Sequence, residues 1–369
     1  MKRQQKTLQR WARKEDRSID RRTFLKRSAQ MGLAGLAAAT LPRIAWGDSS
    51  VAEKTEHSCP DLKFRADGKF KILQLTDTHY VFGDPRSRRA LQNVEEMLDL
   101  EKPDLVIHTG DVIYGKPAEE SLREILAPLS ARRIPFAVTF GNHDEEFGKS
   151  RQEVFDIVRS LPYNINVGVP GIHGVSNDVI TLSSARNADK KWILYLFDSL
   201  HHSSLPDVKG YDYIHFDQIA WYRRQSEAFT RQNGGTPIPS LAFFHIPFPE
   251  YIYALRLDRR RVLRGNFGEE PASPGVNSGL FVSMKEMGDI RAVICGHDHD
   301  NDYAMQWNGM FLMFGRFSGC DTVYNDLKPS GARVIELTEG ESGFRSWIRV
   351  YGQGVTQDLR YPQDFETVL

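Results

Sequence analysis

Residues 70–80 have the sequence FKILQLTDTHY, in which a short run of mostly apolar residues ends in a cluster of polar side chains. Short apolar runs bounded by turn residues are typical of buried strands, so we predict a strand over residues 70–76. Asp77 and His79 come directly after it. Because an open α/β sheet places its functional groups at the carboxyl ends of its strands, these two side chains mark a candidate site.

Polar residues follow four further apolar runs in the same way. The runs cover residues 104–107, 135–140, 241–244 and 291–294, and the fragments after them are Gly110-Asp111, Gly141-Asn142-His143-Asp144, His245 and Gly296-His297-Asp298-His299. Their carboxylate, imidazole and amide groups suit a pair of Fe, Zn or Mn ions better than Ca or a thiolate site. The glycines permit sharp turns and close approach of the backbone at a crowded site. We therefore expect the fragments to meet at one metal centre.

Each fragment has a simpler explanation when it is taken alone. Asp77 and Asp111 could be turn formers at strand ends, and His245 could be a packed core histidine. His297 and His299 are two residues apart, so both imidazoles can leave one side of an extended segment, and this spacing favours a ligand pair. Asp298, the residue between them, then points to the opposite side of the segment and is expected to be structural.

The order Asp-x-His, Gly-Asp, Gly-Asn-His-Asp, isolated His and Gly-His-x-His resembles the calcineurin-like metallophosphoesterase superfamily. The steps of 34 residues from Asp77 to Asp111 and 31 residues from Asp111 to Asn142 fit that pattern. The resemblance extends over about residues 70–350. Three further stretches resemble a branch described as purple-acid-phosphatase-like or related to a yeast phosphatase: residues 217–222, 241–251 and 277–280.

The resemblance implies a four-layer α/β/β/α sandwich that holds two adjacent metal ions. It also implies a role for each motif residue: Asp77, His79 and His299 for the first ion, Asn142, His245 and His297 for the second, and Asp111 as the bridge. His143 is implied to face the substrate as a general acid or transition-state clamp. Asp144 follows it directly and could orient its imidazole.

Hydrolysis of a phosphate ester explains why such residues would be gathered. Two cations roughly 3.5–4 Å apart neutralise the negative oxygens of the ester and hold the attacking and leaving oxygens in line. A water between the ions loses a proton near neutral pH and supplies the attacking hydroxide. The leaving alkoxide then needs a proton, for which the imidazole of His143 is suited.

The remaining aromatic candidates receive weaker roles. Tyr114 lies three residues after Asp111, where true purple acid phosphatases place an iron-binding tyrosinate. Those enzymes lack the histidine of the Asp-x-His motif, which His79 supplies here, so we favour simple packing for Tyr114. We expect a hydrogen-bonded core role for His108. His201 and the histidine after it could line the rim of the site, but we favour a solvated loop for both.

Residues 1–47 are predicted to be a twin-arginine signal peptide. The export motif DRRTFLK at residues 20–26 is followed by a weakly apolar run at 31–41, which is too short for a membrane helix, and by small residues at 45–47. The twin-arginine export machinery is therefore an expected partner. The mature protein is expected to be periplasmic or secreted, to have no membrane span, and to receive its metals before export.

The charge balance differs between this segment and the rest of the chain. The whole chain has 48 basic and 48 acidic residues, whereas residues 1–47 hold 12 basic and 3 acidic ones, which leaves a net charge of −9 for the remainder. A negative body disfavours nonspecific binding of nucleic acids or anionic membranes. Three cysteines (Cys59, Cys295, Cys320) cannot all pair within the chain, and Cys295 is expected to be a buried thiol.

Residues 48–369 are predicted to form one domain, since their number suffices for one large core. The pattern predicts a β-α-β-α-β start with helices near 86–100 and 118–132, then strands near 179–182 and 192–197 and a helix near 217–231. We also expect a polar, arginine-rich insertion at 252–275, a mobile loop at 266–279, and short strands over 303–349 that close a second sheet.

The expected function is that of an exported two-metal phosphoesterase that hydrolyses small phosphate monoesters. The alternative within the same chemistry is a phosphodiesterase acting on nucleotides or lipid head groups. The alternative of another class is a non-catalytic periplasmic metal or phosphate binder. A Ser/Thr protein phosphatase is disfavoured, because that subclass has Asp-Arg-Gly after its Gly-Asp motif, where this chain has Val112-Ile113-Tyr114-Gly115.

Overall fold

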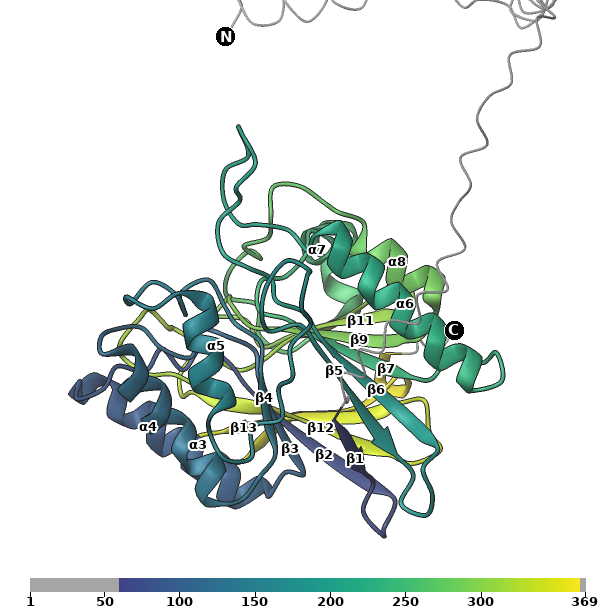
Figure 1. Ribbon diagram of the computed structural model, residues 1–369, viewed down its shortest axis with the longest axis horizontal. Coiled ribbons are helices and arrows are strands. Elements are labelled where there is room, and N and C mark those ends of the chain that lie inside the picture. Colours follow the sequence, from purple (N-terminus) through teal and green to yellow (C-terminus); the bar gives the residue numbers. More distant parts are fainter. Residues whose placement is uncertain (1–59, 366–369) are drawn as a thin grey trace, which may run out of the picture. The chain divides into compact units, whose positions relative to one another are not determined.

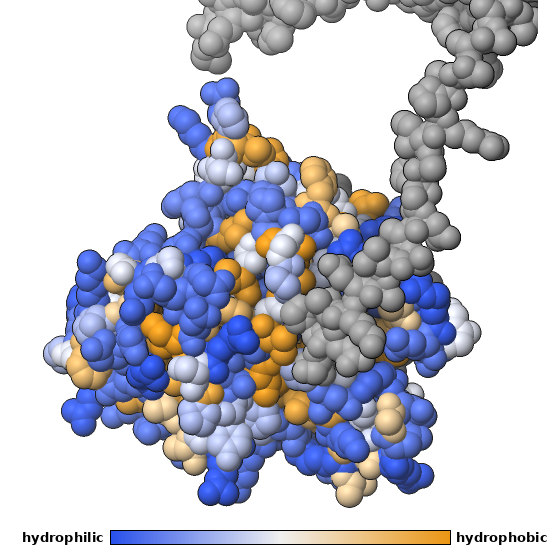
Figure 2. All heavy atoms as spheres, in the orientation of Figure 1, coloured by the Kyte–Doolittle hydropathy of each residue, from blue (hydrophilic) through white to orange (hydrophobic). Residues whose placement is uncertain are grey.

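The computed structural model describes residues 60–365, apart from the side chains of residues 257–262. The predicted signal peptide at residues 1–47 and Cys59 therefore lie outside the described residues. Among the helices that are described, none has the length and apolar composition needed to cross a membrane. On the face drawn in Figure 2, hydrophobic residues form small groups between hydrophilic ones.

Two β-sheets form the centre of the described part (Figure 1). One has the order β14-β13-β12-β2-β3-β4, with β2 (Lys69–Leu75), β3 (Leu105–His108), β4 (Phe136–Val138), β12 (Gly331–Thr338), β13 (Phe344–Val350) and β14 (Val355–Tyr361). The other has the order β1-β5-β6-β7-β9-β11-β10-β8, with β1 (Asp61–Lys63), β5 (Asp178–Ser183), β6 (Lys190–Leu196), β7 (Ser240–Phe243), β8 (Leu263–Arg264), β9 (Ile290–Cys295), β10 (Ala304–Trp307) and β11 (Met310–Phe314). We call them the six-stranded and the eight-stranded sheet.

Helices cover the outer face of each sheet. Figure 1 shows α3 (Arg88–Glu101), α4 (Ala118–Ala131) and α5 (Arg151–Arg159) beside the six-stranded sheet. It shows α6 (Phe216–Gln232), α7 (Glu250–Val262) and α8 (Leu280–Met287) beside the eight-stranded sheet. Short 3₁₀ turns, η1 (Pro85–Ser87) and η2 (Gln363–Phe365), complete the elements. The result is the predicted four-layer α/β/β/α sandwich.

Three apolar clusters correspond to the three interfaces between these layers. One joins α3, α4 and α5 to the six-stranded sheet, a second joins α6, α7 and α8 to the eight-stranded sheet, and the third lies between the sheets. Strand β2 shows how the sequence supplies two of them. Ile72 packs between the sheets, whereas Leu73, its neighbour, packs under the helices, because successive strand residues point to opposite faces.

The β-α-β-α-β start is confirmed. Strands β2, β3 and β4 pair in parallel, and α3 and α4 form the connections between them. Parallel strands bring their carboxyl ends to one edge of the sheet, which is where the polar fragments follow. The free thiol of Cys295 is buried in β9, as expected.

The prediction for residues 303–349 is wrong in part. These residues do not close a single sheet: β10 and β11 join the eight-stranded sheet, and β12 and β13 join the other. Strand β11 pairs in parallel with β9, and all its residues are buried. Its continuous apolar sequence fits a strand covered on both faces, but it does not specify the sheet.

Residues 252–275 also differ from expectation, because helix α7 occupies the first half of this segment. Its arginine-rich sequence has little apolar periodicity, so the pattern did not reveal it. Residues 266–272, expected to be part of a mobile loop, are fastened to residues 298–302. Backbone N–H groups of Gly268 and Ala272 donate to the side chains of Asn301 and Asp298.

The interface between the sheets predicts a large stability effect at Leu194, which is fully buried there. Leu194→Ala should lower the free energy of unfolding by about 2–5 kcal/mol, because it removes apolar contacts and leaves a cavity. The matched change Leu100→Ala, at a side chain that is 52% exposed on α3, should cost no more than about 0.5 kcal/mol. Urea unfolding followed by circular dichroism measures both. Equal losses in the two variants would contradict this layer assignment.

Candidate metal centre

The predicted metal-binding side chains meet where the two sheets end. Three follow strands of the six-stranded sheet, and three follow strands of the eight-stranded sheet: Asp77 after β2, Asp111 after β3, Asn142 after β4, His245 after β7, and His297 and His299 after β9. His79 also comes from the loop after β2. All seven residues are at least 90% buried. Both sheets therefore contribute to one buried polar cluster.

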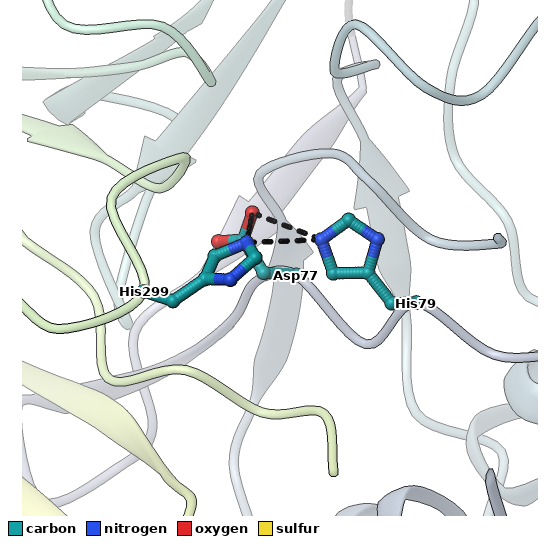
Figure 3. A group of neighbouring side chains, drawn as sticks. All are labelled: Asp77, His79 and His299. Atoms are coloured by element: carbon teal, nitrogen blue, oxygen red, sulfur yellow. Dashed lines mark hydrogen bonds and ion pairs between the residues drawn. The ribbon is translucent and has the colours of Figure 1, made fainter. Parts of the chain in front are cut away.

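Asp77, His79 and His299 form the first group, with one ligand atom from each within 4.8 Å of the others. Figure 3 shows the two imidazoles turned toward each other and toward the carboxylate. Nε2 of His79 lies 3.0 Å from Nε2 of His299, and these atoms lie 3.8 and 3.6 Å from Oδ1 of Asp77. Such convergence suits three ligands of one ion.

Asp111, His245 and His297 form the second group. Nε2 of His245 lies 3.2 Å from Oδ2 of Asp111 and 3.2 Å from Nδ1 of His297. The same oxygen of Asp111 lies 3.6 Å from Nε2 of His79, a member of the first group. Oδ2 of Asp111 is therefore placed between the two groups.

Backbone carbonyl groups fix the tautomers of two imidazoles. Nδ1 of His245 lies 2.7 Å from the carbonyl oxygen of Thr109, and Nδ1 of His299 lies 2.8 Å from that of Tyr324. A carbonyl oxygen only accepts, so each Nδ1 must carry a proton and donate it. In the neutral imidazole, Nε2 then offers its lone pair toward the cluster, as in metal-binding histidines.

Asn142 gives a further sign that the cluster fits a metal. Its side chain is buried, and its Oδ1 has no hydrogen-bond partner among the described residues. A buried amide oxygen without a partner is costly, and a cation would satisfy it. The donor set of carboxylate, imidazole and amide suits Fe, Zn or Mn.

Neighbouring charges within the cluster shift the pKa values of its members. Burial by itself raises the pKa of a carboxyl group, but the nearby imidazoles, His245 above all, hold the pKa of Asp77 and of Asp111 below the usual range. Burial also disfavours the charged form of His245, yet the two carboxylates raise its pKa to about 9. Burial dominates at His79 and His297 and lowers the pKa of each to about 3. The anionic carboxylates and the neutral imidazoles of His79 and His297 are the forms that bind cations, whereas His245 would release a proton when a cation binds.

Four of these residues have a left-handed backbone: φ is 54° at Asp77, 42° at His79, 52° at Asp111 and 79° at His297. For residues other than glycine this conformation costs about 1–3 kcal/mol each, and such strain gathers at functional sites. Hydrogen bonds between loops hold it in place. The N–H of Asp77 donates to the carbonyl of Gly110, and that of His79 to the carbonyl of Asp111, both at 3.0 Å.

Two glycines allow the loops to approach so closely. A Cβ atom at Gly141 would overlap the carboxylate of Asp111, and one at Gly296 would overlap Thr76 and the carboxylate of Asp77. The predicted close approach of the backbone at these positions is therefore present.

His143 borders the cluster and is accessible. Its side chain is 31% exposed, and its ring centroid lies 5.7 Å from that of His79. Nδ1 lies 2.7 Å from Oε2 of Glu146, and the backbone N–H donates to Oδ1 of Asp111 at 2.9 Å. The contact with Glu146 leaves Nε2 of His143 for another partner.

The expectation that Asp144 orients His143 is wrong, because Glu146 occupies that place. The buried carboxylate of Asp144 instead accepts the backbone N–H groups of Asp111, Val112 and Gly141 at 2.8–3.0 Å. Burial and the charge of Asp111 raise its pKa to about 6. Asp144 therefore ties the loop after β3 to the loop after β4.

The other histidines lie as expected. His108 is buried, with Nε2 3.0 Å from the hydroxyl of Thr78 and Nδ1 accepting the N–H of Gly110, so its core role is confirmed. His201 is on the surface, with Nε2 3.1 Å from a carboxylate oxygen of Glu145. It is a solvent-exposed residue outside the two ligand groups.

Tyrosine rings pack against the candidate ligands. Tyr114 is 37% exposed and meets His79 edge-on at a centroid distance of 5.2 Å. Tyr211 meets His297 edge-on at 4.4 Å, and Tyr324 stacks on His299 at 4.4 Å. No motif distinguishes the last two tyrosines, because they lie in loops without periodic sequence.

Comparison with known proteins agrees with this geometry. A family model described as calcineurin-like phosphoesterase matches residues 70–301. Probable inactive purple acid phosphatase 29 of Arabidopsis thaliana is 31% identical, over 79% of each chain. Phosphatase DCR2 of Saccharomyces cerevisiae is 30% identical over 78% of this chain, which spans 54% of the yeast protein. A dimetal phosphatase from Danio rerio shares the fold, with a TM-score of 0.55 at 12% identity over 79% of this chain and 98% of that one. The chain belongs to the calcineurin-like phosphoesterase family.

Proposed function

We propose that this protein is an exported phosphoesterase that uses two metal ions to hydrolyse small phosphate monoesters. The observation that carries the proposal is the position of Oδ2 of Asp111, which lies 3.6 Å from His79 in one ligand group and 3.2 Å from His245 in the other. The two bound cations would neutralise the negative oxygens of the ester and supply hydroxide near neutral pH. The motif DRRTFLK at residues 20–26 supports export.

We assign one set of ligands to each ion: Asp77, His79 and His299 to the first, Asn142, His245 and His297 to the second, and Asp111 to both. Fe, Zn and Mn fit this donor set. Metal-ligand groups found in the structure support six of these seven residues, and the partnerless Oδ1 supports Asn142.

His143 is the residue that we assign to the leaving group. Glu146 holds its Nδ1, so Nε2 is the atom that would donate a proton to the departing alkoxide. The backbone N–H of His143 donates to Oδ1 of Asp111. The proton donor and the bridging carboxylate are thereby fixed relative to each other.

A non-catalytic metal binder is the alternative that one observation favours, since the Arabidopsis relative is named a probable inactive enzyme. In this chain the two ligand groups and an accessible His143 beside them support turnover. Phosphodiesterase activity on nucleotides or lipid head groups is the alternative within the same chemistry. Hydrolysis assays over monoesters and diesters, with each metal in turn, separate all three.

Asp111→Asn tests the bridge. Loss of an outer-shell partner costs a metal site up to about 100-fold in activity. Removing the shared anion, which is a direct ligand, should therefore lower kcat by at least about 100-fold. The wild-type chain should hold two metal ions by mass spectrometry of the metal content, and the variant should hold fewer. A variant with most of its activity and both metals would remove Asp111 from the centre.

His143→Ala tests proton donation. Metal content should stay near that of the wild type, whereas kcat for alkyl phosphates should fall by about 10²–10⁴-fold, because general acids contribute this much to poor leaving groups. An aryl phosphate with an activated leaving group should lose much less. Glu146→Gln, which weakens the hold on the same ring, should show the same substrate pattern to a smaller extent. Equal loss on both substrates would contradict the role.

The visible absorption of iron-loaded protein tests whether His79 or Tyr114 is a ligand. A tyrosinate bound to ferric iron gives an intense visible absorption band, and a site of histidine and aspartate ligands does not. We expect nearly colourless protein, a modest activity change in Tyr114→Phe, and severe loss of metal affinity in His79→Ala. A purple colour that disappears in Tyr114→Phe would reverse this assignment.

A further inference from the structure

A buried ion pair lies next to the candidate centre but contributes no candidate ligand. Arg151 is the first residue of α5, and Asp198 follows β6 in the other sheet. Both are buried, and Nε of Arg151 lies 3.1 and 3.0 Å from the two carboxylate oxygens of Asp198. Burying two charges is favourable only where they are paired and further hydrogen-bonded, so the surroundings of this pair matter.

The surroundings hold Asp198 from every side. Its carboxylate accepts the N–H of Val175 at 2.9 Å and the N–H and hydroxyl of Ser176 at 3.1 and 2.9 Å. Its own N–H donates to Asn177, and its carbonyl accepts from the side chain of Gln218 at 2.8 Å. Burial alone would raise the pKa of Asp198, but Arg151 leads the contacts that hold it at about 2. The carboxylate of Asp198 is therefore held in place by several hydrogen bonds and is ionised at neutral pH.

Arg151 connects Asp198 to the loop after β4. Its Nη1 donates to the carbonyl oxygen of Gly141 at 2.9 Å, while the N–H of Gly141 donates to Asp144 at 2.8 Å. Gly141 is thus held by its carbonyl and by its N–H. These two bonds restrain the backbone directly before Asn142.

The residue after Asp198 anchors a second ligand loop. The hydroxyl oxygen of Ser199, which is buried, accepts the backbone N–H of Ile246 at 3.0 Å. Ile246 follows His245 directly. The neighbouring residues Asp198 and Ser199 therefore reach the loops of Asn142 and of His245, which are both ligands that we assign to the second ion.

The first ligand group is held by other residues. The carbonyl oxygen of His79 accepts the hydroxyl of Thr322 at 2.9 Å, and His299 donates to the carbonyl of Tyr324. The carboxylate of Asp77 accepts the hydroxyl of Thr76 at 2.6 Å. Among the hydrogen bonds described for these three ligands, none involves the anchor formed by Arg151, Asp198 and Ser199.

We propose that Arg151, Asp198 and Ser199 are positioning residues that set the affinity of the second metal position and leave the first unaffected. This inference rests on the proposed two-metal function. Outer-shell partners of metal ligands typically govern affinity by about 10–100-fold. The anchor contacts the loops of Asn142 and His245 but none of the three ligands assigned to the first position. Substitutions at these residues, which contact neither ion position, should therefore weaken binding of the second ion without changing binding of the first.

The test titrates metal-free full-length protein with Mn²⁺ and follows binding by calorimetry and electron paramagnetic resonance. Wild type should bind two ions and show the exchange-coupled signal of a bridged pair. Arg151→Met should bind one ion with unchanged affinity and the second about 10–100-fold more weakly, so that the six-line signal of an isolated ion dominates. Ser199→Ala, which removes one acceptor without burying a charge, should weaken the second ion in the same direction, and Arg151→Lys should lie between Arg151→Met and wild type.

Arg349→Met is the matched control, because Arg349 pairs with the buried carboxylate of Glu101 at 2.6 Å, among residues that are no part of the metal cluster. It should bind both ions as wild type does. Equal weakening of both ions in Arg151→Met and Ser199→Ala, or no weakening in either, would overturn the inference while leaving the two-metal function intact. A wild type that takes up a single ion would overturn that function, and this inference with it. If Arg151→Met does not fold, Ser199→Ala and Arg151→Lys decide the question.

Discussion

Two carboxylates buried between two sheets are the constraint on which the rest of the site depends. Asp77 and Asp111 stay ionised although both side chains are almost fully buried, and this is tolerable only where positive charge and hydrogen-bond donors surround them. Imidazoles and backbone N–H groups surround the two carboxylates and stabilise their negative charge. Asp77 and Asp111 both have a left-handed backbone, and a carboxylate oxygen of each lies within 3.8 Å of Nε2 of His79.

The first strands and helices and the candidate ligand residues could be predicted from local pattern, whereas the four layers and the division of the ligands between two ions were implied by the resemblance to a known family. Strand β2 alternates between two apolar interfaces, and its period of two is visible in the residues themselves. Asp77, Asp111 and His245 each follow such a strand, and parallel strands end at a common edge. The position of each motif after a parallel strand was therefore enough to predict that these motifs lie close together.

Contacts that depend on exact loop geometry could not be predicted. Adjacency suggested that Asp144 serves His143, but the turn aims Asp144 at three backbone N–H groups and brings Glu146 to the imidazole. Strands β10 and β11 pair with β8 and β9 in the eight-stranded sheet, and no local sequence pattern specifies this choice of partners. Arg151 and Asp198 belong to no motif, and their pairing joins the first residue of α5 to the segment after β6, 47 residues further along the chain.

The contribution of both sheets to one cluster has a consequence for the order in which the protein assembles. His79 and His299, whose ring nitrogens lie 3.0 Å apart, are 220 residues apart in the chain. No fragment that folds early can contain the complete cluster, because the last ligands follow β9 and the first follow β2. If the cluster binds two ions as we propose, their tight capture would require both sheets to be docked, so metal binding would follow the docking of the sheets.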